Sequence, residues 1–302
     1  MLGGVMPVLG TPFHDDESVD TEGFERTVRA VAAAGARSAM FPGFASEYHK
    51  LDDGERTELI DVLLRTTTEL GGFSAVVSVP DHATHVAVRR TRQAVDGGAA
   101  AVNLLPPHFL GPSRPAVLAH IEAVLRAAGT TPVILQYAPA QTGTSLDAPT
   151  IAALARRHGN LAFVKVESTP PGALVQALAE SDPPVASLVG YAGVQLPDAL
   201  RRGVQGVQPG CSFVELYMRI WQLWHGGEEQ AAERLHSRLL PYISYWMLNV
   251  ELVVAAEKEI SKRRGWFGSA RCRAPSWQLD QQEMARIDAF LEEFDDMLRG
   301  DQ

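Results

Sequence analysis

Short apolar runs alternate with longer amphipathic segments along the first two thirds of the chain. We expect strands at Val5–Gly10, Ser38–Pro42, Ser74–Val79, Ala100–Leu105, Pro132–Gln136, Leu161–Val166, Ser187–Gly190 and Gly206–Gln208, with helices at 21–34, 52–70, 84–96, 113–128, 148–158, 171–179 and 195–202. Continuous apolar strands separated by helices are typical of a parallel sheet whose faces are covered by helices. Eight such units predict an α/β fold, a closed (β/α)8 TIM barrel. A doubly wound open sheet is the alternative, although no Gly-x-Gly-x-x-Gly turn follows the first strand.

Beyond Ser212 the pattern changes to helices alone. They are predicted at 215–225, 228–264 and 281–298, the second broken near Pro241 because proline disrupts a helix interior. No low-complexity linker precedes them. We therefore expect a barrel over residues 1–211 and a C-terminal helical subdomain over 212–302, packed on the barrel.

Composition limits the partners that this chain can have. With 46% hydrophobic and 21% charged residues it is an ordinary globular sequence, and its net charge of −9 argues against nucleic acid and anionic membranes. Cys211 and Cys272 form neither a metal-ligand spacing nor a disulfide framework. No apolar run is long enough for a membrane span, and the N-terminus lacks a signal-peptide pattern. A cytoplasmic protein that uses no metal and no cofactor is expected.

Lys165 interrupts the apolar run Leu161–Val166. Burial disfavours the ammonium form, so a neutral amine becomes available. That amine is the nucleophile needed to form an imine with a carbonyl substrate. In the alternative, a lysine at a strand end extends to water or pairs with Glu167. An ammonium is expected to stay hydrated at the other lysines, which lie in polar or helical stretches: Lys50, Lys258 and Lys262.

The position of Lys165 in the predicted barrel supports a catalytic role, because catalytic groups lie at the C-terminal ends of barrel strands. Lys165 stands near the end of the sixth predicted strand, and Glu167, two residues on, points to the same side. Glu167 is expected either to move protons during imine chemistry or to form a plain ion pair with the lysine.

Five motifs occur in an order that is familiar from one protein family. They are Gly4–Phe13, the turn Gly43–Glu47 with Leu51 and Glu55-Arg56, Pro106–Phe109, Ile134–Pro139 with Thr142-Gly143, and the Lys165 strand. Together, over roughly residues 3–295, they resemble the dihydrodipicolinate synthase / N-acetylneuraminate lyase family of class I aldolases. The resemblance implies a (β/α)8 barrel with a C-terminal helical bundle. It also implies that Lys165 forms a Schiff base with a 2-oxo acid, usually pyruvate.

The chain departs from the family pattern at the residues that relay protons in the synthases. Phe44 and Ala45 stand where the family has two hydroxyl residues, and the nearby hydroxyl is Ser46, at the usual glycine. Gln136 stands at the proton-donating tyrosine and Tyr137 at the asparagine that follows it. The family's Pro-Tyr-Tyr is replaced by Pro107-His108-Phe109, and its substrate-binding arginine by Gln141. We therefore expect that the chain is not a dihydrodipicolinate synthase.

The remaining pattern, Gln-x-Ala-Pro with Ser-Glu and Lys-x-Glu, resembles the branch that contains 2-keto-3-deoxy-L-arabonate dehydratase. This implies that an imine on Lys165 eliminates water from a 2-keto-3-deoxy sugar acid. Gln136 would orient water or a substrate hydroxyl, and protons would move through Glu167, Tyr137, His108 or substrate groups. The same enamine could serve a pyruvate-dependent aldolase or a hydratase-aldolase with a less polar acceptor. A non-catalytic homologue that binds a 2-oxo acid is a further alternative.

Loops after the predicted strands are expected to shape the substrate pocket. Ser46 is expected either to hold the substrate carboxylate or to serve as a turn hydroxyl, while Glu47 is expected to fix the turn. The other predicted binding residues are Phe44, Ala45, His108, Phe109, Gly190 and Gly210. The last two follow strands seven and eight, where many barrels bind phosphate and where the family shapes its substrate pocket.

An apolar loop suggests self-association. Phe109 and Leu110 would be unusual in a loop of a monomer. The family assembles near this loop, so the resemblance implies a homo-oligomer, a tetramer or dimer, formed through Pro106–Leu110 and Tyr137–Gln141.

Overall fold

The computed structural model describes residues 2–143 and 145–299. The chain forms two compact units. One contains the residues up to Phe73 together with those from Pro209 on, and the other contains Ser74–Gln208.

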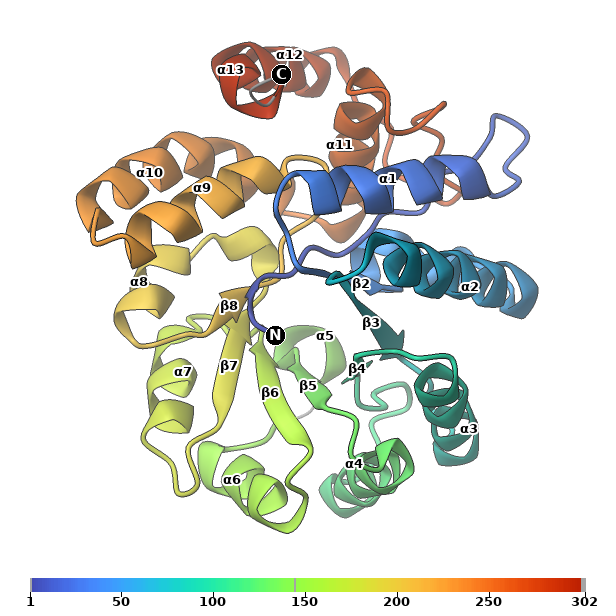
Figure 1. Cartoon of the computed structure of the whole chain (residues 1–302), viewed down its shortest axis with the longest axis vertical. Helices are drawn as coiled ribbons and strands as arrows, with labels where there is room; N and C mark the ends of the chain where they lie inside the picture. The colour runs from blue at the N-terminus through green and yellow to red at the C-terminus, as the bar shows by residue number, and fades with distance from the viewer. Residues whose placement is uncertain (1, 144, 300–302) are drawn as a thin grey trace. The chain divides into compact units, whose positions relative to one another are not determined.

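The Ser74–Gln208 unit holds six parallel strands that pair in chain order: β3 (Ser74–Val79), β4 (Ala101–Leu104), β5 (Val133–Tyr137), β6 (Leu161–Val166), β7 (Ala186–Val189) and β8 (Gly206–Val207). Its helices are α3 (Thr84–Asp96), α4 (Arg114–Ala128), α5 (Pro139–Thr142), α6 (Ala148–Arg157), α7 (Gly172–Ala179), η3 (Tyr191–Gly193) and α8 (Leu196–Arg201). Figure 1 shows α3, α4, α6 and α7 lying outside the strands. Because helices cover one strand face and side chains fill the other, these strands are buried almost throughout.

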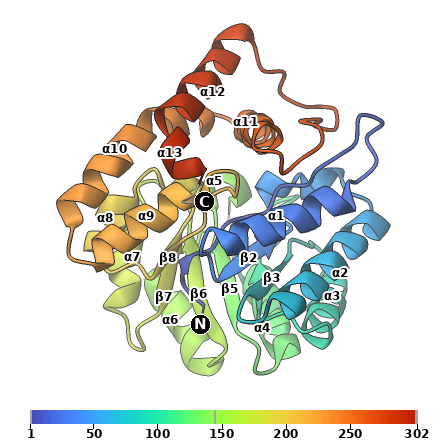
Figure 2. The same ribbon diagram turned by 45° about the horizontal axis from the view of Figure 1, so that its top comes forward.

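The other unit begins with β1 (Gly4–Val5), α1 (Thr21–Ala33), β2 (Ser38–Phe41), η1 (Phe44–Ser46), η2 (Tyr48–Lys50) and α2 (Asp53–Leu70). Val8 forms parallel bridges both with Met40 on β2 and with Gly210, which follows β8 in the chain. The unit ends with α9 (Val214–His225), α10 (Glu229–Trp246), α11 (Val250–Arg263), α12 (Gln281–Glu293) and α13 (Asp295–Leu298). Helices α9 and α10 pack side by side (Figure 2).

The strand order is β1-β8-β7-β6-β5-β4-β3-β2, so strands that are consecutive in sequence are neighbours. Parallel strands in this order, each followed by a helical segment, define a (β/α)8 barrel. The predicted fold class, a TIM barrel with C-terminal helices, is confirmed.

Most predicted elements lie within one or two residues of their predicted bounds, and the ranges of β3 and β6 are unchanged. Helix α2 starts with a capping box, in which Asp52 accepts from the Glu55 backbone N–H at 2.8 Å and Glu55 accepts from that of Asp52 at 3.0 Å. The short helix α5 was not predicted.

The predicted break near Pro241 is wrong. Helix α10 continues through Pro241 to Trp246. The break lies just before α11, where the Asn249 side chain accepts from the Glu251 backbone N–H at 2.8 Å and caps the new helix. Leu239 and Ile243 are buried on either side of the proline, and this packing offsets its missing hydrogen bond.

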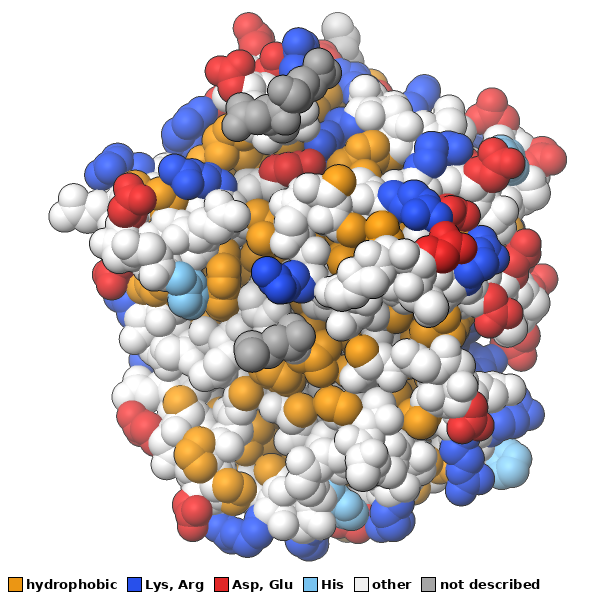
Figure 3. All heavy atoms as spheres, in the orientation of Figure 1, with side chains coloured by type: hydrophobic (Ala, Val, Ile, Leu, Met, Phe, Trp, Pro, Cys, Tyr) orange, Lys and Arg blue, Asp and Glu red, His pale blue; other side chains and the backbone are white. Residues whose placement is uncertain are grey.

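The charges on the surface are mixed. On the face shown in Figure 3, Lys and Arg side chains stand among Asp and Glu side chains. Among the described residues, no helix is both long and apolar enough to cross a membrane.

Candidate active site

Lys165 lies on β6 and is 4% exposed. In the parallel ladder it is flanked by Gln136 on β5 and by Leu188 on β7. Its Nζ is 3.2 Å from Oε1 of Glu167, so the structure brings the two predicted catalytic residues together as a buried ion pair.

Glu167 follows β6 directly and is 7% exposed. Its backbone N–H donates to the Tyr137 carbonyl at 2.8 Å, which fixes the start of the loop. While Oε1 faces Lys165, Oε2 accepts a hydrogen bond of 2.7 Å from Nε2 of Gln136. The carboxylate is therefore held between an ammonium or amine group and a carboxamide.

The hydrogen bonds continue to residues that the sequence analysis did not identify. Oε1 of Gln136 accepts from Nδ2 of Asn103 on β4 at 3.0 Å, and the same nitrogen donates to Oγ of Ser78 on β3 at 2.9 Å. We call Ser78, Asn103, Gln136 and Glu167 the polar chain. A polar residue inside an apolar strand is the signal that identified Lys165, and it could have identified Asn103 as well.

Gly190, at the end of β7, makes room for this carboxylate. A Cβ at this position would lie 2.3 Å from Oε1 and 2.5 Å from Cγ of Glu167. The neighbouring Tyr191 donates to Oε1 of Gln141 at 2.9 Å. Burial raises the pKa of Tyr191, and the negative charge of Glu167 acts in the same direction.

Tyr137, His108 and Phe109 are placed differently from the polar chain. Strand alternation directs Tyr137 to the face opposite Gln136, its neighbour on β5. Among the described contacts of His108 are one with the Pro106 carbonyl, 3.3 Å from Nδ1, and one with the His82 ring, at a centroid distance of 4.5 Å. Phe109 is 72% exposed.

The predicted binding residues Phe44, Ala45 and Ser46 form η1 in the other unit. Oγ of Ser46 donates to the Leu9 carbonyl and accepts from the Gly43 backbone N–H at 2.9 Å. The hydroxyl thus accepts from the backbone of its own turn and donates to the backbone of the N-terminal segment, which favours the turn alternative for Ser46.

Gly210 is closely covered by a buried acid. A Cβ on Gly210 would lie 2.0 Å from Oε1 of Glu257, and the Ser212 backbone N–H donates to Oε2 of that carboxyl at 2.9 Å. Burial raises the pKa of Glu257. Gly210 therefore gives space to this side chain.

Glu47 is fully buried at a left-handed backbone position, φ 52°. It pairs with Lys50, 3.0 Å from Oε2, and with Lys258. The expectation that the ammonium group stays hydrated is wrong for Lys50, whose side chain is 7% exposed, and for Lys258. The Lys258 side chain is buried, its Nζ lies 4.2 Å from the Phe13 ring centroid and donates to the Arg271 carbonyl at 2.8 Å, and burial lowers its pKa.

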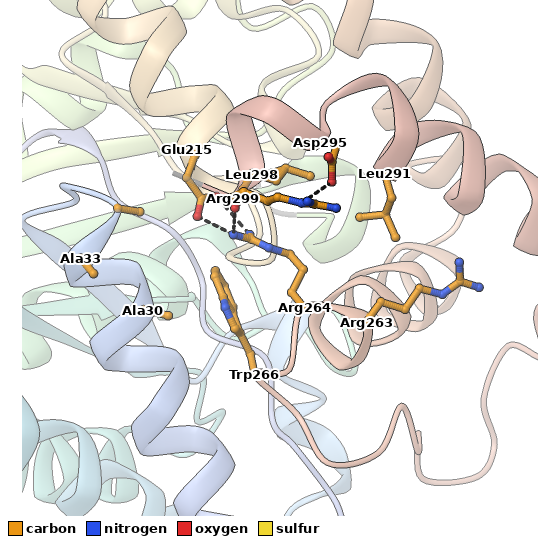
Figure 4. A pocket seen from close by; sticks show the side chains of 11 residues that line it. Ala30, Ala33, Glu215, Arg263, Arg264, Trp266, Leu291, Asp295, Leu298 and Arg299 are labelled. Atoms are coloured by element: carbon orange, nitrogen blue, oxygen red, sulfur yellow. Dashed lines mark hydrogen bonds and ion pairs between the residues drawn. The ribbon is translucent and has the colours of Figure 1, made fainter. Parts of the chain in front are cut away.

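A hollow of about 670 Å³ lies beside α1 and α13 (Figure 4). On its wall, Arg264 donates to both carboxylate oxygens of Glu215 at 2.6 and 3.1 Å and to the carbonyls of Leu298 and Ser212, and it stacks on Trp266. Because the Arg264 guanidinium is engaged in these contacts, its role at the hollow is structural.

The fold and the polar chain define a (β/α)8-barrel protein with a buried lysine–carboxylate pair at the C-terminal end of a strand. Neighbouring strands supply polar groups that orient this pair. The chain belongs to the dihydrodipicolinate synthetase family, whose profile matches residues 1–294, and it is a lyase of that family. The predicted family resemblance is confirmed.

Named relatives cover most of the chain. It is 28% identical over 304 residues to an L-2-keto-3-deoxyarabonate dehydratase of Azospirillum brasilense, covering 98% of this chain and 95% of the relative. It is 26% identical over 242 residues to a 4-hydroxy-tetrahydrodipicolinate synthase of Methanopyrus kandleri, covering 80% of each. The crystal structure of a dihydrodipicolinate synthase from Rhodopseudomonas palustris has a TM-score of 0.89 at 23% identity, covering 96% of this chain and 97% of that one.

Proposed function

We propose that the protein is a Schiff-base lyase that removes water from a 2-keto-3-deoxy sugar acid through Lys165. The observation that carries the proposal is the buried Lys165 amine, 3.2 Å from a carboxylate whose second oxygen is held by Gln136. The similarity to a keto-deoxyarabonate dehydratase over 98% of the chain supports the same reaction class.

The reaction proceeds by steps that these residues can serve. The neutral amine of Lys165 adds to the C2 carbonyl of the substrate, and loss of water gives the iminium. The iminium acidifies the C3 protons, and Glu167, as a carboxylate, accepts one of them to give an enamine. The enamine expels the C4 hydroxyl, which leaves as water with the proton that Glu167 returns. Hydrolysis of the resulting imine releases the dehydrated product and restores the lysine.

The proposal distinguishes the chain from dihydrodipicolinate synthases. Gln136 stands where the family places its tyrosine, and a carboxamide neither releases nor accepts a proton near neutral pH. Its oxygen and nitrogen are bound to Asn103 and Glu167. Several of the named relatives are 4-hydroxy-tetrahydrodipicolinate synthases, so synthase activity is the competing outcome of the test.

A second candidate rests on the apolar side chains. Phe44 replaces a family hydroxyl residue, and exposed Phe109 stands in the β4–α4 loop. These residues favour a less polar acceptor, as in a hydratase-aldolase that joins pyruvate to an aryl aldehyde. The relative rates with sugar acids and with aryl aldehydes separate the two candidates.

Borohydride trapping tests the imine directly. The protein is incubated with pyruvate, reduced and digested, and the expected mass increase lies on the peptide with Lys165. Lys258 is a matched internal control, because it too is buried and paired with a carboxylate, that of Glu47. No adduct with any of a panel of 2-oxo acids, or an adduct on Lys258 alone, would overturn the proposal.

Substrate class is tested with three assays on the same enzyme. Dehydration of 3-deoxy-2-oxo sugar acids is expected to be fastest. Faster condensation of pyruvate with aspartate semialdehyde would identify a synthase, and faster reaction with aryl aldehydes would identify an aldolase. Lys165→Gln retains an N–H donor toward Glu167 without a nucleophile and is expected to abolish both turnover and trapping.

A further inference from the structure

Asn103 lies in the middle of β4 and is fully buried. A carboxamide nitrogen carries two hydrogens, and both are used here, one toward Ser78 and one toward Gln136. Its Oδ1 accepts no hydrogen bond within the described residues. Asn103 therefore acts on the polar chain only as a donor.

Because Asn103 is a donor, it determines which group donates and which accepts in the hydrogen bonds that lead on to Glu167. Because Asn103 donates, Gln136 must present its oxygen to Asn103 and its nitrogen to Glu167. An N–H directed at Glu167 is matched by the ionised carboxylate, which only accepts. With the carboxamide of Gln136 turned over, its oxygen would face the carboxylate oxygen at the present distance of 2.7 Å, and the two would repel each other.

We propose that Asn103 is a positioning residue for the reaction of Lys165: it fixes the carboxamide of Gln136 in one orientation and so holds the carboxyl group of Glu167 in place facing the amine. This inference rests on the proposed function, because it assigns to Glu167 the role of base. Asn103 acts on the substrate only through Gln136 and Glu167.

Two charged or titratable groups face Glu167 besides the polar chain. Lys165 pairs with Oε1 of Glu167, and the negative charge of Glu167 helps to raise the pKa of Tyr191 on η3. Neither group replaces the N–H of Gln136, because within the described residues Oε2 accepts its hydrogen bond from Gln136 and the ion pair with Lys165 is made by Oε1. The orientation of Gln136 is thus the element that Asn103 controls.

The test is a double-mutant cycle between Asn103→Leu and Glu167→Gln. Asn103→Leu keeps the size of the side chain and removes the donor, so kcat is expected to fall about tenfold or more while Lys165 is still trapped by pyruvate and borohydride. In the Glu167→Gln background the side chain at 167 can donate as well as accept, so the orientation of Gln136 no longer matters. There Asn103→Leu is expected to change kcat by less than about twofold. Equal fold-losses in both backgrounds would show a merely structural role and overturn the inference.

Asn160→Leu is the matched control. Asn160 makes the same kind of hydrogen bond, from Nδ2 to the Leu125 carbonyl at 2.8 Å, at the opposite end of β6. The same substitution there is expected to lower the melting temperature and to leave kcat and trapping unchanged. A loss of kcat at Asn160 equal to that at Asn103 would remove the argument for positioning.

Crystal structures of the ligand-free variants separate the inference from the proposed function. The side chains of Gln136 and Glu167 are expected to be displaced in Asn103→Leu, relative to their positions in Asn160→Leu. If they stay in place, the inference fails even when wild-type protein is trapped by pyruvate. If they move and the wild-type protein is never trapped, the proposed function fails while the positioning by Asn103 stands.

Discussion

Gly190→Ala offers a direct test of the close approach between Gly190 and the Glu167 carboxylate. The added Cβ would lie 2.3 Å from Oε1, 2.5 Å from Cγ and 2.7 Å from Cδ of Glu167. Ordinary contact begins at 3.4 Å, so the carboxyl group must move by about 1 Å. A movement of the side-chain tip alone does not relieve the clash, because Cγ is also too close.

The consequence follows from the contacts that the carboxylate now makes. Its bonds of 2.7 Å to Gln136 and 3.2 Å to Lys165 cannot both survive such a displacement. A misplacement of about 1 Å can reduce the rate of an enzyme by about 100-fold. We therefore expect kcat to fall by about 100-fold, overpacking to cost about 1–3 kcal/mol of stability, and imine trapping at Lys165 to persist.

Single-turnover and steady-state kinetics on the best substrate measure the first effect, and thermal unfolding measures the second. Gly159→Ala is the control, because a Cβ there meets nothing within 4 Å and the backbone is not in the left-handed region. In a Glu167→Ala background, which removes the clashing side chain, Gly190→Ala should cost little further stability. Wild-type kcat and melting temperature in Gly190→Ala would refute the reasoning.

Three further outcomes are expected. Burial raises the pKa of Glu257, so the folded protein holds this proton more tightly than the unfolded chain does. The stability that this proton contributes is fully present below the ordinary carboxyl pKa and is lost as pH rises above it, so Glu257→Gln should flatten the fall in melting temperature with rising pH. Arg264→Ala leaves partly buried Glu215 without its partner and should lower the unfolding free energy by about 2–4 kcal/mol; an unchanged denaturant midpoint would contradict this. The exposed Phe109 and Leu110 predict a homo-oligomer, so light scattering near 32.7 kDa would refute self-association, while serine at both positions should produce that mass.

The fold was largely predictable because its signals are local. β3 and β6 are continuous apolar runs that end at polar turns, so their bounds can be read from neighbouring residues. The break between α10 and α11 was misplaced because Pro241, a local signal, competed with packing by buried Leu239 and Ile243. Tertiary burial determines where α10 ends, and this burial cannot be read from a short window of sequence.

The candidate site was only partly predictable for the same reason. Lys165 is on β6 and Glu167, two residues on, directly follows that strand, so continued strand alternation places them on one side. Asn103 joins them only through the register that sets β3, β4, β5 and β6 side by side. Lys258 was misjudged because its partner Glu47 is far away in the sequence. Both cases depend on pairings across long intervals, which periodicity does not encode.

The polar chain has a consequence for how such a protein can change over evolutionary time. Ser78, Asn103 and Gln136 stand on three consecutive strands and Glu167 directly follows the fourth, so a single uninterrupted stretch, residues 78–167, encodes the whole polar chain and Lys165 as well. One recombination event between related genes could therefore transfer the reactive lysine with its supporting hydrogen bonds intact. Residues outside that stretch could then diverge toward new substrates while the inherited chemistry remained the same.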